Sequence, residues 1–299
     1  MPALPSKVRF TVLFASDEGY ARHLATAIYS LLVNNKTLPI EIVLFTASMP
    51  VADINRFELI CSKFNTPLKV IWLDDEWFQG LILNHHFRKA NYYRLFASDL
   101  IEKDECLYLD ADVVIDGPID GFIGIDLADS YLAAVVNPGF NGHKELGMRT
   151  DAGYFNSGVM LLNLSRWRES NLKNRAIALA LENPAAIEFV DQCALNGVVD
   201  GEWVRLEPRY NLQTAMLAQD QDREYFCKHA PVVIHFTGGD KPWFPWNNHP
   251  FKRKYWSYRN MTPYSSFIFD DFGLNVVGRL LLLPWLKHLL KASLSRIGK

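Results

Sequence analysis

Strand-type and helix-type segments alternate through the start of the chain. Segments 8–15, 40–46 and 68–73 are rich in β-branched and aromatic residues, and each is followed by polar residues. Between them, apolar residues recur at helical spacing over 20–34 and 51–64. Because strand–helix–strand connections are right-handed and return the next strand parallel to the first, this pattern predicts an α/β fold with a mostly parallel central sheet.

The sequence Asp110-Ala111-Asp112 interrupts an apolar stretch and is the strongest candidate site. Apolar residues occupy 107–109 and 113–115, so a buried strand would carry the two carboxylates to its C-terminal end. In open α/β sheets, ligands bind beyond the carboxyl ends of the strands, and Asp17 after the first strand would share that edge. Two carboxylates in this position can hold Mg²⁺ or Mn²⁺ against a diphosphate.

The same Asp-x-Asp spacing recurs at Asp220 and Asp222 and serves as an internal control. A chain of 300 residues contains roughly one such pair by chance. The second pair lies in the polar run Gln-Asp-Gln-Asp-Arg-Glu, which we interpret as a solvated surface turn. The apolar context therefore distinguishes the first pair from the second.

A second informative stretch begins where a predicted strand, 232–235, ends in His235. Two glycines follow at Gly238 and the next position, then Lys241, Pro and Trp. Imidazole can complete a Mn²⁺ site whose other ligands are carboxylates, whereas glycine amides and a lysine ammonium suit phosphate oxygens. A histidine at a strand end is more often structural, but the residues that follow it favour a phosphate site.

The remaining segments are predicted as follows. Residues 89–97 form a helix that carries Arg94, and 131–136 and 154–163 form strands separated by a Gly-rich candidate lid. Ser165 caps a helix that runs to Leu181, and a short helix carries Asp191 and Gln192 near its start. In the second of these strands, Asn156 and Gly158 suggest a backbone that passes close to a ligand, with a tight bulge as the alternative.

Composition indicates one large core and a distinct tail. The 299 residues are 49% hydrophobic and 21% charged, as in ordinary globular domains. Four cysteines without metal-ligand spacing are predicted to be reduced, buried thiols, namely Cys61, Cys106, Cys193 and Cys227. Neither a signal-peptide pattern nor an apolar run of 18 residues is present, so we expect a cytoplasmic protein, attached peripherally to the membrane if attached at all.

Residues 250–299 contain nine Lys and Arg and two Asp, a net charge of +7, which leaves −9 for the rest of the total of −2. From Pro284 onward, leucines fall on one helical face and cationic residues on the others. We interpret 261–299 as a segment that lies on an anionic membrane surface, and the basic-aromatic patch 252–259 adds to it. The alternative is an amphipathic helix packed on the protein's own core or on a second subunit. Nucleic acid is not the expected partner.

Taken together, these motifs resemble those of the bacterial family 8 glycosyltransferases, the retaining galactosyl- and glucosyltransferases that build lipopolysaccharide cores, with glycogenin as a distant relative. The resemblance covers about residues 8–260. Its motifs, in the family's order, are Phe14-Ala-Ser-Asp17-x-x-Tyr20, Tyr93-Arg94-Leu95, Tyr108-Leu-Asp110-Ala-Asp112, Phe155-Asn156-Ser-Gly158-Val159, Asp191-Gln192 and His235-Phe-Thr-Gly238-Gly-Asp-Lys241-Pro-Trp243.

The resemblance implies a single Rossmann-like nucleotide-sugar-binding domain of GT-A type over 1–260, a Mn²⁺ (or Mg²⁺) cofactor, a UDP-hexose donor and a glycan or glycolipid acceptor. The implied metal ligands are Asp110, Asp112 and His235. The implied donor-site residues are Ala15, Asp17, Tyr20, Arg94, Asp110, Ala111, Asn156, Gly238 and Lys241, and the implied catalytic residues are Asp191 and Gln192. Family members often carry Asn where Gly19 stands, so one side-chain contact to the nucleotide is expected to be missing.

Two other functions fit parts of the sequence. Asp110-Ala-Asp112-Val-Val also matches the motif of haloacid-dehalogenase-type phosphatases, in which the first Asp is the nucleophile, and Asp270 with Asp271 mimics their distal acidic pair. That motif normally lies on the first strand of its domain, whereas three strands are predicted before it here. A sugar-nucleotide-binding protein without catalysis would keep the metal site and lose turnover.

Overall fold

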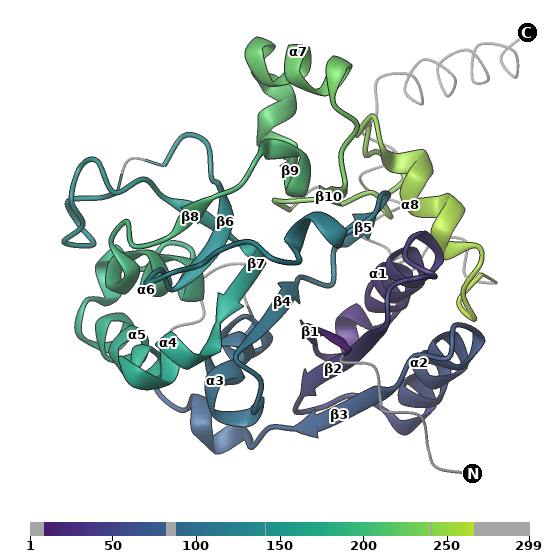
Figure 1. The fold of residues 1–299 in the computed structure, drawn as a ribbon, viewed down its shortest axis with the longest axis horizontal. Coiled ribbons are helices and arrows are strands. Elements are labelled where there is room, and N and C mark those ends of the chain that lie inside the picture. Colours follow the sequence, from purple (N-terminus) through teal and green to yellow (C-terminus); the bar gives the residue numbers. More distant parts are fainter. Residues whose placement is uncertain (1–8, 82–87, 141, 240, 266–299) are drawn as a thin grey trace, which may run out of the picture.

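The computed structural model describes residues 9–81, 88–140, 142–239 and 241–265 (Figure 1). The predicted membrane-association helix lies outside the described residues, as do His85 and His86 of the loop before Arg88 and the distal acidic pair Asp270 and Asp271. Within the described ranges, none of the helices combines the length and the apolarity that crossing a membrane requires.

A seven-stranded sheet forms the centre of the fold, with the strand order β3-β2-β1-β4-β7-β6-β8. Its strands are β1 (Phe10–Ala15), β2 (Ile40–Thr46), β3 (Leu68–Trp72), β4 (Glu105–Leu109), β6 (Leu132–Val136), β7 (Phe155–Asn163) and β8 (Val204–Arg205). The pairs β1/β2, β2/β3, β1/β4 and β6/β8 are parallel, whereas β7 runs antiparallel to both β4 and β6. The predicted α/β fold with a mostly parallel sheet is confirmed.

A second, three-stranded sheet lies beyond the carboxyl end of β4. It has the order β5-β10-β9 and consists of β5 (Val113–Ile115), β10 (Val233–His235) and β9 (Leu212–Gln213). The chain leaves the large sheet after Leu109 and enters the small one at Val113, which lies opposite His235 in an antiparallel pair. The link between β4 and β5 therefore holds Asp110 and Asp112 at the junction of the two sheets.

Helices cover both faces of the large sheet (Figure 1). The α-helices are α1 (Ala21–Asn34), α2 (Val51–Lys63), α3 (Ala97–Leu100), α4 (Leu164–Glu169), α5 (Leu172–Glu182), α6 (Val190–Val199), α7 (Asp220–Lys228) and α8 (Lys252–Arg259). Short 3₁₀ segments span Glu18–Tyr20, Asp75–Phe78, Lys89–Phe96, Asp120–Phe122, Pro184–Ala186, Pro208–Tyr210 and Thr214–Ala218.

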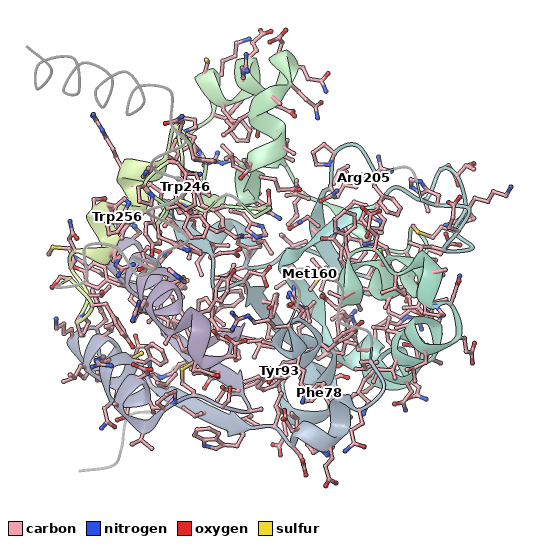
Figure 2. The ribbon with its side chains drawn as sticks, turned by 180° about the vertical axis from the view of Figure 1, so that it is seen from behind. Phe78, Tyr93, Met160, Arg205, Trp246 and Trp256 are labelled. Carbon is pink, nitrogen blue, oxygen red and sulfur yellow. The ribbon has the colours of Figure 1, made fainter. Side chains whose placement is uncertain are left out.

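Burial on both faces explains why the central strands read as continuous apolar runs. In β1, Leu13 belongs to the core that the α4–α6 side covers, and Phe14 belongs to the core under α1 and α2. On the first of these sides, Phe78 contacts Tyr93 with ring centres 4.8 Å apart, in the same core cluster as Met160 of β7 (Figure 2).

Several local predictions were wrong. The predicted helix from Ser165 to Leu181 is two helices, α4 and α5, because Asn171 between them adopts a left-handed conformation (φ 52°). The N-cap of α4 is Asn163, whose side chain accepts a hydrogen bond from the Arg166 amide at 3.0 Å. The segment that carries Arg94 is a 3₁₀ helix, and Arg94 lies near its end.

Two predictions about polar groups also need correction. Asp220 and Asp222 do not lie in a surface loop. They belong to the first helical turn of α7, where acidic side chains interact favourably with the helix dipole. Asp220 is nevertheless fully solvated, with 99% of its side chain exposed. Of the four cysteines, three are buried as predicted, but Cys227 on α7 is exposed.

The basic-aromatic segment 252–259 is α8, which packs against α1. Lys252 donates to the carbonyl of Phe244 at 2.8 Å, and Arg259 is completely buried. Tyr264, beyond the helix, is buried and donates to Asp53 of α2 at 2.6 Å. Lys254 also pairs with Asp116 at 3.1 Å, so three of the four cationic residues predicted to form a surface patch here are engaged within the domain, and contacts with the domain continue beyond residue 260.

Candidate metal and donor site

The candidate site lies at the carboxyl ends of β1 and β4. These strands are parallel and pair Phe14 with Leu109, so Ala15 and Asp110 leave the sheet side by side. This confirms that the polar residues after the two strands share one edge.

Asp110, Asp112 and His235 converge to form a candidate cation site. His235 Nε2 lies 3.2 Å from Asp112 Oδ1 and 3.6 Å from Asp110 Oδ2. One ligand atom from each of the three residues can be chosen so that all lie within 4.8 Å of one another. Two carboxylates and one imidazole form a donor set that suits Mn²⁺, and the spacing of these atoms fits a single divalent ion.

A chain of amide hydrogen bonds orients the imidazole. The Gly158 amide donates to Asn156 Oδ1 at 3.1 Å, and Asn211 Nδ2 donates to the same oxygen at 2.9 Å. Asn211 therefore presents its own Oδ1 to His235 Nδ1, 3.1 Å away, which places the proton on Nδ1 and leaves the Nε2 lone pair for a cation. Asn211 was missed in the sequence, because its segment contains no motif that points to a ligand.

Gly158 has no side chain, and His235 and Asp110 of the candidate site occupy the space that a side chain would fill. A Cβ at this position would lie 2.2 Å from His235 Cε1 and 2.5 Å from Asp110 Oδ2. The Gly158 carbonyl also accepts from the Asp110 amide at 2.8 Å, which ties β7 to the residue that follows β4. The close approach predicted for the Gly158 backbone is therefore an approach to the side chains of the candidate metal ligands Asp110 and His235.

Arg94 is buried behind the carboxylates and joins two of them. Its Nη2 lies 2.9 Å from Asp110 Oδ1 and its Nε 3.1 Å from Asp191 Oδ2. Its Nη1 donates to the Ser157 carbonyl at 2.6 Å. Burial raises the pKa of Asp191 to about 6, since Arg94 offsets this effect only partly and the Asp110 charge adds to it. Arg94 thus holds the acidic side chains in position, and its predicted contact with the nucleotide stays a prediction.

Lys241 is paired with Asp112. Its Nζ lies 2.5 Å from Asp112 Oδ2 and donates to the Phe236 carbonyl at 2.6 Å. Burial opposes ionisation of Asp112, but the positive charge of Lys241 acts against it, and the pKa of this carboxyl lies well below its usual range. Asp112 is therefore a carboxylate at any physiological pH. Gly238, in the loop before Lys241, is exposed and has φ +82°, a conformation that favours glycine.

Asp191 and Gln192 line the same region from α6. Gln192 Oε1 accepts from Asn156 Nδ2 at 3.1 Å and from the Ser157 amide at 3.0 Å, so the acceptor end of its amide faces β7. Asp191 Oδ2 accepts from the Ser157 hydroxyl at 3.1 Å as well as from Arg94. Both predicted catalytic side chains are thus buried and held by strand β7.

The loop after β1 carries the remaining predicted residues. Asp17 accepts from the Gly19 amide at 3.0 Å and thereby caps the 3₁₀ turn that ends at Tyr20. Burial, followed by the negative charge of Asp112, raises the pKa of the Tyr20 phenol. The structure therefore brings this loop and the two acidic ligands together. It also brings in Arg88, which no sequence motif singled out.

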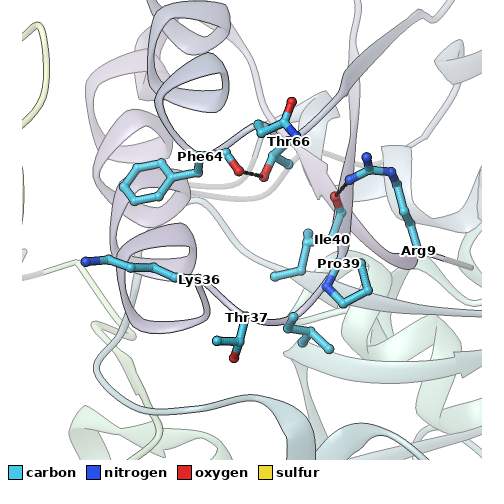
Figure 3. A pocket seen from close by; sticks show the side chains of 9 residues that line it. Arg9, Lys36, Thr37, Pro39, Ile40, Phe64 and Thr66 are labelled. Atoms are coloured by element: carbon cyan, nitrogen blue, oxygen red, sulfur yellow. Dashed lines mark hydrogen bonds between the residues drawn. The ribbon is translucent and has the colours of Figure 1, made fainter. Parts of the chain in front are cut away.

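A cavity of about 360 Å³ lies at the opposite edge of the sheet, where β1 and β2 begin (Figure 3). Its lining residues are Arg9, Lys36, Thr37, Leu38, Pro39, Ile40, Phe64, Asn65 and Thr66. This lining has no carboxylate or imidazole and contains none of the predicted site residues, so the cavity is separate from the candidate metal site.

Known proteins are similar to this chain over most of its length. The chain is 30% identical over 273 residues to General stress protein A of Bacillus subtilis (strain 168), which covers 85% of this chain and 94% of the relative. It is 26% identical over 269 residues to the lipopolysaccharide 1,3-galactosyltransferase of Salmonella typhimurium, with 86% and 80% covered.

Solved structures show the same fold. The galactosyltransferase LgtC, solved in complex with donor and acceptor sugar analogues, superposes with a TM-score of 0.78 at 24% identity, over 85% of this chain and 96% of that one. Glycosyltransferase GlyE of Streptococcus pneumoniae TIGR4 superposes with a TM-score of 0.69 at 24% identity, over 90% and 64%. The model of the family described as Glycosyl transferase family 8 matches residues 11–247. The chain therefore belongs to glycosyl transferase family 8 and is a glycosyltransferase.

Proposed function

We propose that this glycosyltransferase moves a hexose from a UDP-sugar to a hydroxyl of a lipopolysaccharide or another surface glycan, with retention of configuration and with Mn²⁺ as cofactor. The observation that carries the proposal is the cluster of Asp110, Asp112 and His235 beside Lys241 at the carboxyl edge of the sheet. The acceptor class is suggested by relatives such as the lipopolysaccharide 1,3-galactosyltransferase and a lipopolysaccharide 1,2-glucosyltransferase of Escherichia coli.

The charged groups would act on the leaving diphosphate. A divalent ion held by Asp110, Asp112 and His235 would neutralise negative charge on the diphosphate as the bond to the sugar breaks. Lys241, now bonded to Asp112, lies close enough to the candidate ligands to donate to a phosphate oxygen of the same group. Arg94, whose Nη2 lies 2.9 Å from Asp110 Oδ1, would keep Asp110 oriented for this purpose.

The environment of the buried Asp191 carboxylate indicates how the reaction would retain the configuration of the sugar. Arg94 and the Ser157 hydroxyl both hold its Oδ2 at 3.1 Å, and its pKa is raised to about 6. These contacts fix one oxygen of the carboxylate, and moving that oxygen toward the sugar would cost both of them. We therefore favour attack of the acceptor hydroxyl from the side of the leaving diphosphate, with Gln192 and Asp191 shaping the sugar pocket.

The first test is donor turnover. We expect release of UDP from UDP-glucose or UDP-galactose in the presence of Mn²⁺, and little or none when the metal is removed with a chelator. UDP release is measured with each donor, with and without Mn²⁺ and with Mg²⁺ in its place. Hydrolysis of a phosphate monoester without turnover of either donor would favour the phosphatase alternative, and UDP-sugar binding without turnover would favour the non-catalytic one.

We also propose that the protein is cytoplasmic and that its tail attaches it to the inner face of the cytoplasmic membrane. The support is the sequence of 261–299, where cationic residues accompany an apolar face. Each basic residue near an anionic leaflet contributes on the order of 1 kcal/mol. Attachment there would bring the donor site close to a glycolipid acceptor.

Co-sedimentation of the full chain with anionic and neutral vesicles tests the attachment. We expect binding to anionic vesicles that weakens with salt, and a decrease of roughly tenfold or more when Lys287→Gln and Lys291→Gln remove two charges. Arg223→Gln with Lys228→Gln, which removes the same charge from exposed α7, is the matched control. Equal binding by both double variants would contradict an anchoring role for the tail.

A further inference from the structure

The guanidinium of Arg88 lies over the loop that follows β1. Its Nη1 is 3.2 Å from Asp17 Oδ2 and 3.3 Å from Asp17 Oδ1, and its Cζ is 5.9 Å from the centre of the Tyr20 ring. A Cβ at Gly19 would lie 2.3 Å from the same Nη1. The absence of a side chain at position 19 is therefore what admits the guanidinium, which reaches this loop from a segment far away in the sequence.

Stability alone does not account for this arrangement. The Arg88 side chain is 55% exposed, and exposed ion pairs contribute only about 0–1 kcal/mol to folding. Asp17 also has its own role as the cap of the 3₁₀ turn, through its bond to the Gly19 amide. The ion pair with Arg88 is thus not needed to hold the loop, and it engages only the Nη1 nitrogen of the guanidinium.

Arg88 differs from the other cations beside the candidate site in how it is engaged. Arg94 is buried and shared by two carboxylates, and Lys241 is bonded to Asp112. Within the described part of the chain, the hydrogen bonds of the Arg88 guanidinium go to Asp17 alone and use one of its three nitrogens. The remaining N–H groups form a planar fork of the kind that binds phosphate oxygens.

Tyr20 lies between the Arg88 guanidinium and the Trp243 ring in a chain of ring contacts. The Tyr20 ring lies 5.9 Å from the guanidinium carbon and 5.8 Å, edge to face, from the ring of Trp243. Trp243 is two residues beyond Lys241, whose ammonium contacts the metal-ligand candidate Asp112. Tyr20 therefore contacts both Arg88 and the segment that carries Lys241 and Trp243.

We propose that Arg88 is a binding residue for the diphosphate of the donor nucleotide, held over the loop by Asp17 in the space that Gly19 leaves open. This inference rests on the proposed function, because it assumes a nucleoside diphosphate as the ligand of this edge. In this arrangement Arg88 and Lys241 both contact the diphosphate, and the guanidinium takes over a contact that a side chain at position 19 could otherwise make.

The test is nucleotide affinity, measured by titration calorimetry with Mn²⁺ present. Arg88→Gln is expected to raise the Kd for UDP about tenfold and to leave the affinity for uridine, measured by competition, unchanged, since a hydrogen bond between charged groups is lost. Lys89→Gln, which removes the neighbouring charge from its pair with Asp75, is the control and should leave both affinities unchanged. An unchanged Kd for UDP, or an equal loss for uridine, would overturn the proposal.

The pairing with Gly19 gives a second, independent test. Gly19→Ala should displace the guanidinium and weaken UDP binding, but it should cause no further loss in a chain that already carries Arg88→Gln. Additive losses would show that the two positions act separately, contrary to the proposal. A wild-type protein that does not bind UDP would instead refute the proposed function, whereas normal UDP binding and Mn²⁺-dependent turnover with an unaffected Arg88→Gln variant would refute only the role of Arg88.

Discussion

Replacement of Asp112 by asparagine is expected to reduce donor turnover by about 100-fold or more while the protein stays folded. Loss of groups that merely support a metal ligand already costs about 10- to 100-fold, so loss of a charged ligand should cost at least as much. The amide has nearly the volume of the carboxylate and leaves no cavity, but it carries no charge for the cation or for Lys241. Turnover and Mn²⁺ affinity are to be measured together with the melting temperature.

The chain contains its own control for this experiment. Asp220→Asn alters the first position of the other Asp-x-Asp pair, where the side chain is 99% exposed, and should leave turnover and Mn²⁺ affinity at wild-type values. His235→Ala should behave like Asp112→Asn, because it removes the nitrogen ligand. Wild-type rates for both site variants at limiting Mn²⁺ would show that these residues do not hold the metal.

Gly158→Ala is expected to abolish the metal site by steric conflict without removing any ligand. The new methyl group would lie 2.2 Å from His235 Cε1 and 2.5 Å from Asp110 Oδ2, so both side chains must move. Overpacking of this kind costs about 1–3 kcal/mol of stability, and a displacement of the ligands should reduce turnover by roughly 100-fold. Mn²⁺ affinity, turnover and the free energy of unfolding measure the three effects.

Gly117→Ala is the matched control, because a Cβ there meets nothing closer than the Val232 backbone at 3.4 Å. It should change the free energy of unfolding little and leave Mn²⁺ affinity intact. If Gly158→Ala bound Mn²⁺ as tightly as the wild type, the ligand set inferred from Asp110 and His235 would be wrong.

The sequence by itself determined the fold class and singled out the candidate metal ligands. Strand and helix patterns depend on local hydrophobic periodicity, which is visible in a short window, and they predicted the mostly parallel sheet correctly. Asp110 and Asp112 stand out because burying a carboxylate beside a strand costs free energy unless the carboxylate is paired or binds a cation. His235 stands out because of the glycines and the lysine that follow it.

Only the tertiary structure decided how polar groups from distant segments are paired. The family resemblance makes Arg94 a candidate for contact with the nucleotide, and folding buries it between Asp110 and Asp191. Asn211 has no motif of its own, but its bond to Nδ1 leaves Nε2 of His235 free for the candidate cation site. Such pairs form where strand order and loop path bring the segments together, and no local periodicity encodes that path.

The same reason explains Gly19 and Arg88. In the sequence, Gly19 shows only that no side chain is present at that position, and nothing distinguishes Arg88 from the other cationic residues. In the structure, the space left by the first is filled by the guanidinium of the second. Hydrophobic patterning, a property of neighbouring residues, is sufficient to predict the sheet, whereas the complementarity of a space and a side chain exists only after the chain has folded around both.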